Sequence, residues 1–163
     1  MTQDSQPNER DDFVRYLRQM LFLPYLWGGQ MPSEGFDCSG MVTSGFRRIG
    51  KLEENQDKNA DALFQSMKTQ VIQRSAAKAG CLAFWFNQEN RAVHVATFID
   101  RHSIIHASGG GSSTLTIEDA MQKDAFIKIR YFDKFATYRK DRFNQKYKIV
   151  DPFLNTDTPG DPS

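Results

Sequence analysis

The stretch Gly35-Phe36-Asp37-Cys38-Ser39-Gly40-Met41-Val42 marks the point where a turn ends and a helix begins. Residues 27–36, which lead up to Asp37, are rich in glycine and proline, which favour turns. From position 38 onward, small and apolar residues recur at the spacing of one helix face, namely Cys38, Met41, Val42, Gly45, Phe46 and Ile49. Gly50 is well placed to end this helix. The pattern therefore predicts that Cys38 lies at a helix N-terminus.

A thiol in that position is a candidate nucleophile. Unpaired backbone amides and the helix dipole favour an anion there, so the pKa of Cys38 is expected to fall below the free value of about 8.5. The same amides could receive the negative oxygen that develops on an attacked carbonyl group. However, a cysteine on an apolar helix face is more often a small buried hydrophobic residue. The charge of Asp37 also disfavours a thiolate, unless its side chain turns away to bond backbone or substrate.

Two histidines, His94 and His106, lie on consecutive predicted strands that the segment Asp100-Arg101-His102 connects. If this hairpin loop has three residues, His106 lies opposite Ala96, one diagonal step of roughly 7 Å from His94 and on the same face. A two-residue loop would place the two rings on opposite faces. One imidazole can accept the thiol proton, and a second can fix the orientation of the first. Two structural histidines remain an alternative, as does a zinc site, which no HExxH or CxxC spacing supports.

The rest of the chain predicts helices first and strands afterwards. Apolar residues at helical spacing begin near Glu9, and a shorter helix carries Leu63, Phe64 and Met67. Runs of strand character, a flexible glycine loop and a short helix follow at 81–86, 92–99, 103–108, 109–113, 117–122 and 126–131. The mixed charges of residues 134–150 allow no assignment. The predicted class is α+β, with one domain over 9–150, a disordered lead-in at 1–8 and a flexible tail at 151–163.

The composition restricts the classes of function. The length of 163 residues suits one domain with a real core, and the net charge of +1 does not favour a nucleic-acid binder. No stretch of about 20 apolar residues is present, so no membrane span is expected. The polar residues 1–12 lack the apolar core of a secretory signal, which leaves the delivery route open. We expect a monomer that needs no cofactor and no metal.

Three separated blocks resemble the NlpC-type murein peptidases, which are papain-like cysteine peptidases of the bacterial cell wall. The blocks are Pro24-Tyr25-Leu26-Trp27-Gly28-Gly29 with Gly35-Phe36-Asp37-Cys38-Ser39-Gly40-Met41-Val42, then His94-Val95-Ala96, then Ile105-His106-Ala107. They occur in the family's order and with similar gaps, and the resemblance covers roughly residues 13–131.

The resemblance implies a papain-like α+β fold in which N-terminal helices pack on an antiparallel sheet. It implies that Cys38 is the nucleophile, His94 the base and His106 the orienting third member. Tyr25 matches a tyrosine that lies by the nucleophile and helps to hold the oxyanion, although an aromatic packing role is equally open. Asp37 and Ser39 match positions that touch the acyl-side peptide, although Ser39 could serve only as a polar residue at the helix start.

The chain departs from the family pattern at two places. Gly80-Cys81-Leu82 stands where relatives commonly show Gly-Asp-Leu, and Asp61-Ala62 stands where an arginine and a serine are usual. Cys81 is expected to be a small strand residue rather than a second nucleophile. The loop before the third helix could alter specificity if it helps to bind substrate.

The implied function is hydrolysis of an amide bond in peptidoglycan stem peptides, often the bond from the γ-carboxyl of D-glutamate to a diamino acid, through a thioester. The implied partner is thus a stem peptide or muropeptide, at the cell wall or delivered by a phage or secretion apparatus. Amidase action at the glycan–peptide junction and acyl transfer are alternatives that use the same triad. A wall-binding module without chemistry is a different class, but such a module should lack a triad member, and all three are present.

Overall fold

The computed structural model describes residues 8–31, 35–52 and 58–154 and confirms the α+β class. The α-helices are α1 (Glu9–Arg18), α2 (Cys38–Arg48), α3 (Ala60–Met67), α4 (Ile117–Lys123) and α5 (Phe132–Phe143), and short 3-10 turns span Lys68–Gln70 and Arg74–Ala76. The strands are β1 (Gln30–Met31), β2 (Gly35–Phe36), β3 (Val71–Ile72), β4 (Leu82–Phe86), β5 (Ala92–Phe98), β6 (Ser103–Ser108), β7 (Phe126–Tyr131) and β8 (Lys146–Val150). The expected lead-in at 1–8 and tail at 151–163 lie outside the described residues, apart from Asn8 and residues 151–154.

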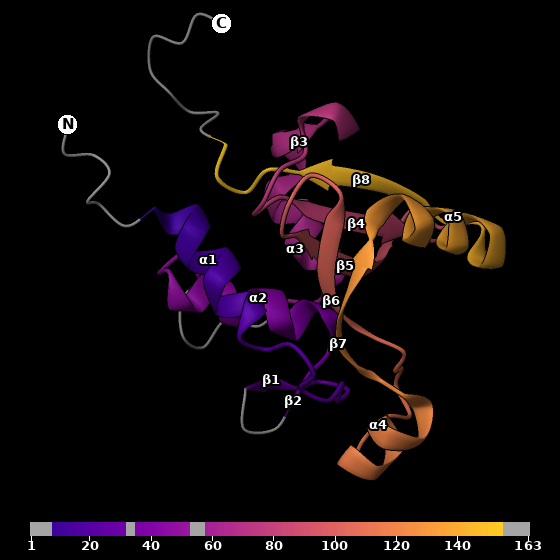
Figure 1. Ribbon diagram of the computed structural model, residues 1–163. Coiled ribbons are helices and arrows are strands. Elements are labelled where there is room, and N and C mark those ends of the chain that lie inside the picture. Colours follow the sequence, from indigo (N-terminus) through magenta and orange to yellow (C-terminus); the bar gives the residue numbers. More distant parts are fainter. Residues whose placement is uncertain (1–7, 32–34, 53–57, 155–163) are drawn as a thin grey trace, which may run out of the picture.

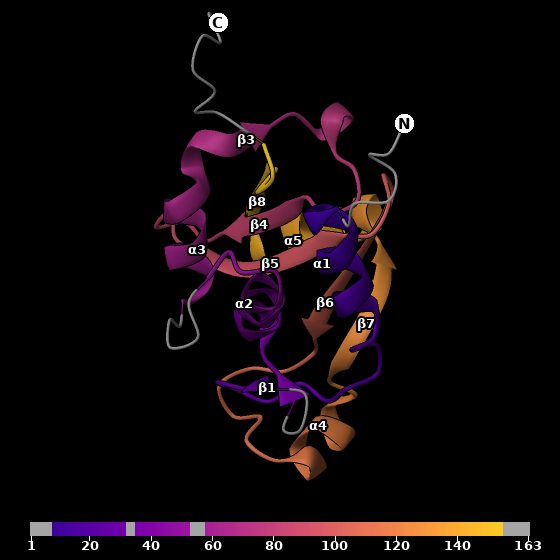
Figure 2. The same ribbon diagram turned by 90° about the vertical axis from the view of Figure 1, so that its left-hand side faces the viewer.

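A central antiparallel sheet separates two apolar layers. In the described residues its strands follow the order β3-β8-β4-β5-β6-β7. Helices α1 and α2 lie on one side of this sheet and α5 lies on the other (Figure 1). The turned view places α2 across the middle of the first side, with α1 and α3 beside it (Figure 2). None of the helices in the described segments is long and apolar enough to cross a bilayer.

Helix α2 lies close to α1 because Gly45 faces the ring of Phe13. A Cβ at position 45 would lie 2.5 Å from a carbon of that ring, so a larger residue would push the helices apart. Phe13 also stacks on Phe46 of α2, with ring centroids 4.8 Å apart. This contact joins α1 to α2 in the apolar core that both helices share with the sheet, and it helps to fix the position of α2.

The β5–β6 hairpin has the three-residue loop that the sequence predicts. Thr97 pairs with Ile105, which is the register of that loop length. The carboxylate of Asp100 accepts hydrogen bonds from the amides of His102 and Ser103, both at 2.8 Å. These bonds fix the turn and thus the register of the two strands that carry the histidines.

Residues 134–150, which the sequence pattern left unassigned, form most of α5 and all of β8. Helix α5 follows β7 directly, and no side chain caps its start. It ends at Asn144, whose left-handed conformation (φ 54°) is a common helix end for asparagine. Strand β8 then inserts between β3 and β4, so the last strand of the described chain lies inside the sheet.

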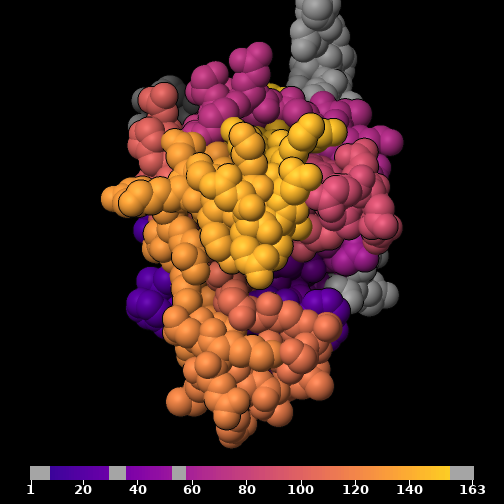
Figure 3. Space-filling view, turned by 90° about the vertical axis from the view of Figure 1, so that its right-hand side faces the viewer, coloured from indigo at the N-terminus to yellow at the C-terminus, as the bar shows by residue number. Residues whose placement is uncertain are grey.

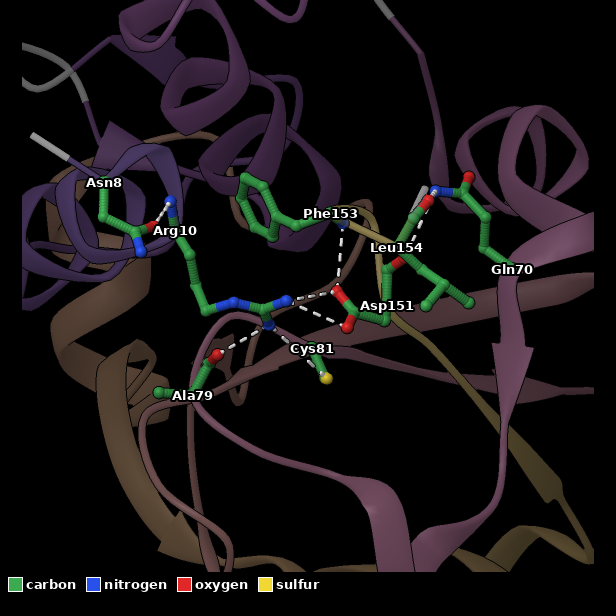
Figure 4. Close-up of polar contacts among 8 residues, drawn as sticks. All are labelled: Asn8, Arg10, Gln70, Ala79, Cys81, Asp151, Phe153 and Leu154. Carbon is green, nitrogen blue, oxygen red and sulfur yellow. Dashed lines mark hydrogen bonds and ion pairs between the residues drawn. The ribbon is translucent and has the colours of Figure 1, made fainter. Parts of the chain in front are cut away.

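An ion pair between Arg10 and Asp151, here called the Arg10–Asp151 clamp, joins the first helix to the end of β8 (Figure 4). Arg10 Nη2 donates to the two Asp151 oxygens at 3.0 and 2.9 Å, and Nη1 donates to the Ala79 carbonyl at 3.0 Å. The Cys81 sulfur lies 4.0 Å from Nη1. Cys81 is thus a buried residue immediately before β4, and Asp151 supplies the carboxylate that Arg10 binds. Because Asp151 is buried, the packed region extends past the boundary expected at residue 150.

Candidate active site

Cys38 is the first residue of α2, and Asp37 is the N-cap of that helix. Asp37 Oδ1 accepts from the amide of Gly40 at 2.6 Å, and Oδ2 accepts from the amide of Gly28 at 3.0 Å. A Cβ at Gly40 would collide with the carbonyl oxygen of Gly29. The Asp37 carboxylate and the small Gly40 therefore hold the preceding turn against the helix and fix Cys38 at its tip.

The pKa of Cys38 is raised to about 11. Burial is the largest cause, and the negative charge of Asp37 acts in the same direction. Hydrogen bonds from the backbone amides of Val95 and Ser39, together with the charge of Arg139, lower the pKa by less. The expectation of an easily ionised thiol is therefore wrong for this structure, because removing a thiolate from water outweighs the helix terminus.

His94 of β5 and His106 of β6 contact each other on the same face, as the hairpin register predicts. His94 Nε2 and His106 Nδ1 are 2.8 Å apart, and the two residues are 9% and 1% exposed. Burial lowers the pKa of both rings, to about 3 for His106, and the charges of Arg130 and Arg139 act in the same direction. Both imidazoles are therefore neutral near pH 7, and one ring donates the shared hydrogen bond to the other.

Strands β5 and β6 separate beside the imidazole pair. In the described chain their paired positions end at Thr97 and Ile105. Val95 lies two residues nearer to the site, and its amide hydrogen-bonds the sulfur of Cys38. The tip of α2 thus lies at the gap between the two strands. Through this gap Cys38, which comes from the α2 side of the sheet, shares a cleft with His94, which faces the α5 side.

Cys38 and His94 both line a cleft of about 1260 Å³. Figure 3 shows a hollow between the block of α5 and β8 and the lobe that contains α4, with indigo residues of the N-terminal part at its floor. The glycine loop at 109–111 and residues of α5 line the cleft as well. Among the described residues, the hydrogen bonds to the Cys38 sulfur come from backbone amides and none joins it to an imidazole.

The remaining expected site residues, Tyr25, Asp37 and Ser39, line the same cleft. Burial, followed by the charges of Cys38 and Asp37, raises the pKa of Tyr25, so its hydroxyl stays protonated beside the sulfur. The ring of Tyr25 packs on Gly110, where a Cβ would collide with it. Ser39 is buried, and its hydroxyl lies 3.5 Å from Asp37 Oδ1.

The contribution of α5 to this site was not predicted from the sequence pattern. The Phe135 ring lies 4.6 Å from the His106 ring, centroid to centroid, and covers the imidazole pair. Arg139 of the same helix lines the cleft, and its charge acts on Cys38. The apolar spacing of Phe132 and Phe135, with Asn144 as a helix end, was the available signal for this helix.

Within the described segments, no three His, Cys, Asp or Glu side chains form a group that could hold a metal ion. Cys38, His94 and His106, the thiol and two imidazoles of the alternative zinc site, do not form such a group there.

The sequence profile of the NlpC/P60 family matches residues 23–131. Murein DD-endopeptidase MepH of Escherichia coli is 31% identical over 111 residues, which are 66% of this chain and 40% of that protein. The gamma-D-glutamyl-L-lysine dipeptidyl-peptidase of Bacillus subtilis is 28% identical over 129 residues, which are 77% of this chain and 42% of that protein. The chain thus spans less than half the length of these relatives.

Two solved structures share the fold. The NlpC/p60 domain of the peptidoglycan hydrolase SagA is 23% identical with a TM-score of 0.58, covering 88% of this chain and 99% of that one. RipD of Mycobacterium tuberculosis, described as a non-catalytic domain adapted to peptidoglycan binding, is 14% identical with a TM-score of 0.58, covering 89% and 98%. With a family profile that matches well over half of its residues and a fold that agrees, the chain belongs to the NlpC/P60 family.

Proposed function

We propose that this chain is a cysteine peptidase that hydrolyses an amide bond in peptidoglycan stem peptides, with Cys38 as the nucleophile. The observation that carries the proposal is the shared cleft: a thiol at a helix tip and a buried neutral imidazole, backed by a second ring, line or flank one cavity. The substrate class is supported by two relatives, one named as a murein DD-endopeptidase and the other as a gamma-D-glutamyl-L-lysine dipeptidyl-peptidase.

The raised pKa of Cys38 and the lowered pKa of His94 define how the thiol is activated. Thiol and imidazole are both neutral at rest, so the proton moves to His94 as the sulfur attacks the carbonyl carbon. The carbon–nitrogen bond then breaks, His94 returns the proton to the leaving amine, and a thioester remains. Water attacks this thioester with His94 again as base, which releases the acid and the free thiol. General-base contacts are often longer before substrate binds, and this mechanism requires the contact of sulfur and ring to close in the complex.

His106 holds His94 in the tautomer that this mechanism needs. If His94 Nδ1 is to accept the thiol proton, Nε2 carries the hydrogen that His106 Nδ1 accepts at 2.8 Å. His106 stays neutral through the cycle because its pKa is about 3. It therefore remains an acceptor when His94 becomes an imidazolium, which is the role that a carboxylate or amide plays in other triads.

Tyr25 is the candidate oxyanion donor, since its hydroxyl is protonated and close enough to feel the charge of Cys38. The Ser39 amide, which bonds the sulfur, is the other donor of the helix tip. Asp37 uses both carboxylate oxygens for backbone amides. Its main task in this mechanism is thus to fix the turn and the helix tip, and any contact with the acyl-side peptide is additional.

The bond that we propose is the γ-D-glutamyl bond to a diamino acid. The two relatives are named for different bonds, so membership of the family leaves the choice open. Cleavage at the glycan–peptide junction and acyl transfer through the same thioester are the alternatives among enzymes. The RipD example supports a non-catalytic wall-binding module as the alternative outside enzymes.

Digestion of purified muropeptides, followed by mass spectrometry of the products, tests the proposal. Hydrolysis of the γ-glutamyl bond yields two fragments whose masses sum to the substrate plus one water, and the fragment masses identify the bond. Cys38→Ala is the matched inactive control, and activity should persist in EDTA. Intact muropeptides after incubation with the unaltered chain, or full activity of Cys38→Ala, would refute the proposal.

A further inference from the structure

The cleft carries more positive than negative charge. Arg91, Arg130, Lys134 and Arg139 line it, whereas Asp37 is its acidic side chain and accepts hydrogen bonds from backbone amides. This excess of positive charge favours a substrate that carries negative charge, because a cleft lined by charges of one sign attracts ligands of the opposite sign.

Of these four cations, Arg139 is the one whose charge acts on the nucleophile. Its charge lowers the pKa of Cys38. Burial lowers the pKa of Arg139 itself, and the charge of Cys38 opposes this shift. Arg130, by contrast, donates to the hydroxyl of Ser108 at 3.2 Å, and Arg91 lies 4.0 Å from the carboxylate of Asp61.

The guanidinium of Arg139 is held in place from three sides. Nε and Nη2 donate to the side-chain oxygen of Gln145 at 2.7 and 2.5 Å. Its central carbon lies 5.7 Å from the Phe135 ring centroid and 5.1 Å from the Phe143 ring centroid. A planar group fixed in this way is ready to bind a ligand without losing much rotamer freedom.

The partner of Arg139 is a neutral amide, although the side chain is half-buried. The ion pairs of the described residues are formed by other basic side chains. Nη1 has no hydrogen-bond partner within the described part of the chain. A desolvated cation without an anion is unfavourable, so the site lacks one carboxylate that a ligand can supply.

Arg139 also lies outside the part of the chain that matches the family profile, which ends at residue 131. Helix α5 therefore adds a charged wall to a site whose other candidate residues lie within that match.

We propose that Arg139 binds a carboxylate of the substrate that flanks the scissile amide, and that it makes this protein prefer free-acid over amidated stem peptides. The inference rests on the proposed function. A γ-linked D-glutamate keeps a free α-carboxylate, which three carbons separate from the reacting carbonyl. The diamino acid supplies a second carboxylate, on the carbon that carries the leaving nitrogen. The shared chemistry is a carboxylate on one of the two residues that the scissile amide joins, and the experiment separates the two sources.

Three synthetic tripeptides of L-alanine, γ-linked D-glutamate and a diamino acid provide the test with the unaltered full chain. One carries both carboxylates, one has the glutamate α-carboxyl amidated, and one has the diamino-acid carboxyls amidated. We expect kcat/KM to fall roughly 10- to 100-fold for one of the two amidated peptides, the size of a lost charge-assisted hydrogen bond. The peptide that loses activity identifies the carboxylate. Equal kcat/KM for all three peptides would overturn the inference without any variant.

Variants then assign the preference to Arg139. In Arg139→Gln the difference between the free-acid and amidated peptides should disappear, whereas Arg139→Lys should keep part of it. Arg142→Gln is the matched control, since Arg142 lies on the same helix over the Phe143 ring but does not line the cleft. The ratio between peptides removes any effect of Arg139 on the reactivity of Cys38, because that effect is common to all substrates. An Arg139→Gln enzyme that still prefers the free acid would refute the assignment.

Binding measurements keep this inference separate from the proposed function. The same peptides are titrated by calorimetry into Cys38→Ala and into Cys38→Ala/Arg139→Gln. Tighter binding of the free acid by the first variant alone supports the carboxylate site, even if the unaltered chain cleaves none of the peptides. Equal binding of all peptides by Cys38→Ala, combined with cleavage by the unaltered chain, would leave the peptidase proposal intact and reject the role of Arg139.

Discussion

Arg10 and Arg139 are both partly buried, but their hydrogen-bond partners differ in charge. Arg10 donates to both oxygens of the Asp151 carboxylate and to a backbone carbonyl, so its charge is neutralised where it is buried. Arg139 donates to the neutral side chain of Gln145 and keeps its positive charge beside the nucleophile. The charge of Arg10 is therefore balanced by a carboxylate of the same chain, whereas the hydrogen-bond partner of Arg139 is a neutral amide.

The difference separates a structural region from a functional one. Arg10, Asp151 and Arg139 all lie outside residues 23–131, so segments on both sides of the family match contribute to the fold. Arg10 and Asp151 join α1 to the end of β8, and Arg139 lines the cleft. Variants of the Arg10–Asp151 clamp should therefore change the free energy of unfolding, and variants of the cleft should change catalysis.

The largest effect is expected at the cleft. His94→Ala removes the base, and kcat/KM for a muropeptide should fall by about 10³-fold or more, within the usual range for general-base catalysis. Steady-state kinetics by mass spectrometry or chromatography measure the loss, and far-UV circular dichroism should show an unchanged fold. A variant that retains more than a tenth of the activity would contradict the assigned role.

The next largest effect is expected at the clamp. Arg10→Ala leaves the Asp151 carboxylate buried without its partner, and the free energy of unfolding should fall by about 3 kcal/mol. Urea denaturation measures this change, and kcat/KM should stay near that of the unaltered chain while the variant is folded. Arg15→Ala is the matched control, because the Arg15–Asp12 pair is exposed and should contribute no more than about 0.5 kcal/mol. Equal destabilisation by both variants would break the comparison.

The sequence predicted the part of the site that local patterns determine. Helical periodicity placed Cys38 at the start of α2, and an odd hairpin loop placed both imidazoles on one face. Each prediction needs only the period of one element or the parity of one loop. The helix start and the hairpin register each depend on a stretch of about fifteen residues, so one sequence is enough to predict them.

Contacts between distant segments were not predictable in the same way. The pKa of Cys38 depends on how deeply the thiol is buried by Val95 and its neighbours, which no spacing near position 38 reveals. Helix α5 was missed because it follows β7 without a turn residue or a capping side chain, and its surface is mostly charged. Its apolar face is recognised only when Phe135 is seen to cover the histidines. Burial by remote elements, rather than local propensity, decided these features.

A smaller effect is expected from the second imidazole. His106→Ala removes the acceptor that orients His94, and kcat/KM should fall roughly 10- to 100-fold, less than for His94→Ala. The loss should lie mainly in kcat, since His106 is buried behind His94 and should not contact substrate. His102→Ala, in the exposed hairpin loop, is the control and should change neither constant. A loss in His106→Ala that is confined to KM would argue against an orienting role.

The smallest effect concerns the charge of Arg139 on the thiol. Because the pKa of Cys38 is about 11, its rate of alkylation by iodoacetamide should rise about tenfold per pH unit from pH 7 to pH 10, without a plateau. Arg139 lowers this pKa, so Arg139→Gln should raise it and slow alkylation by a few-fold at each pH below 11, a size typical of partly screened charges. The fully buried Cys81 serves as the internal control and should react only after unfolding. A plateau below pH 8 would mean that a thiolate–imidazolium pair already exists at rest, and His94 would then act as a counter-ion before it acts as a base.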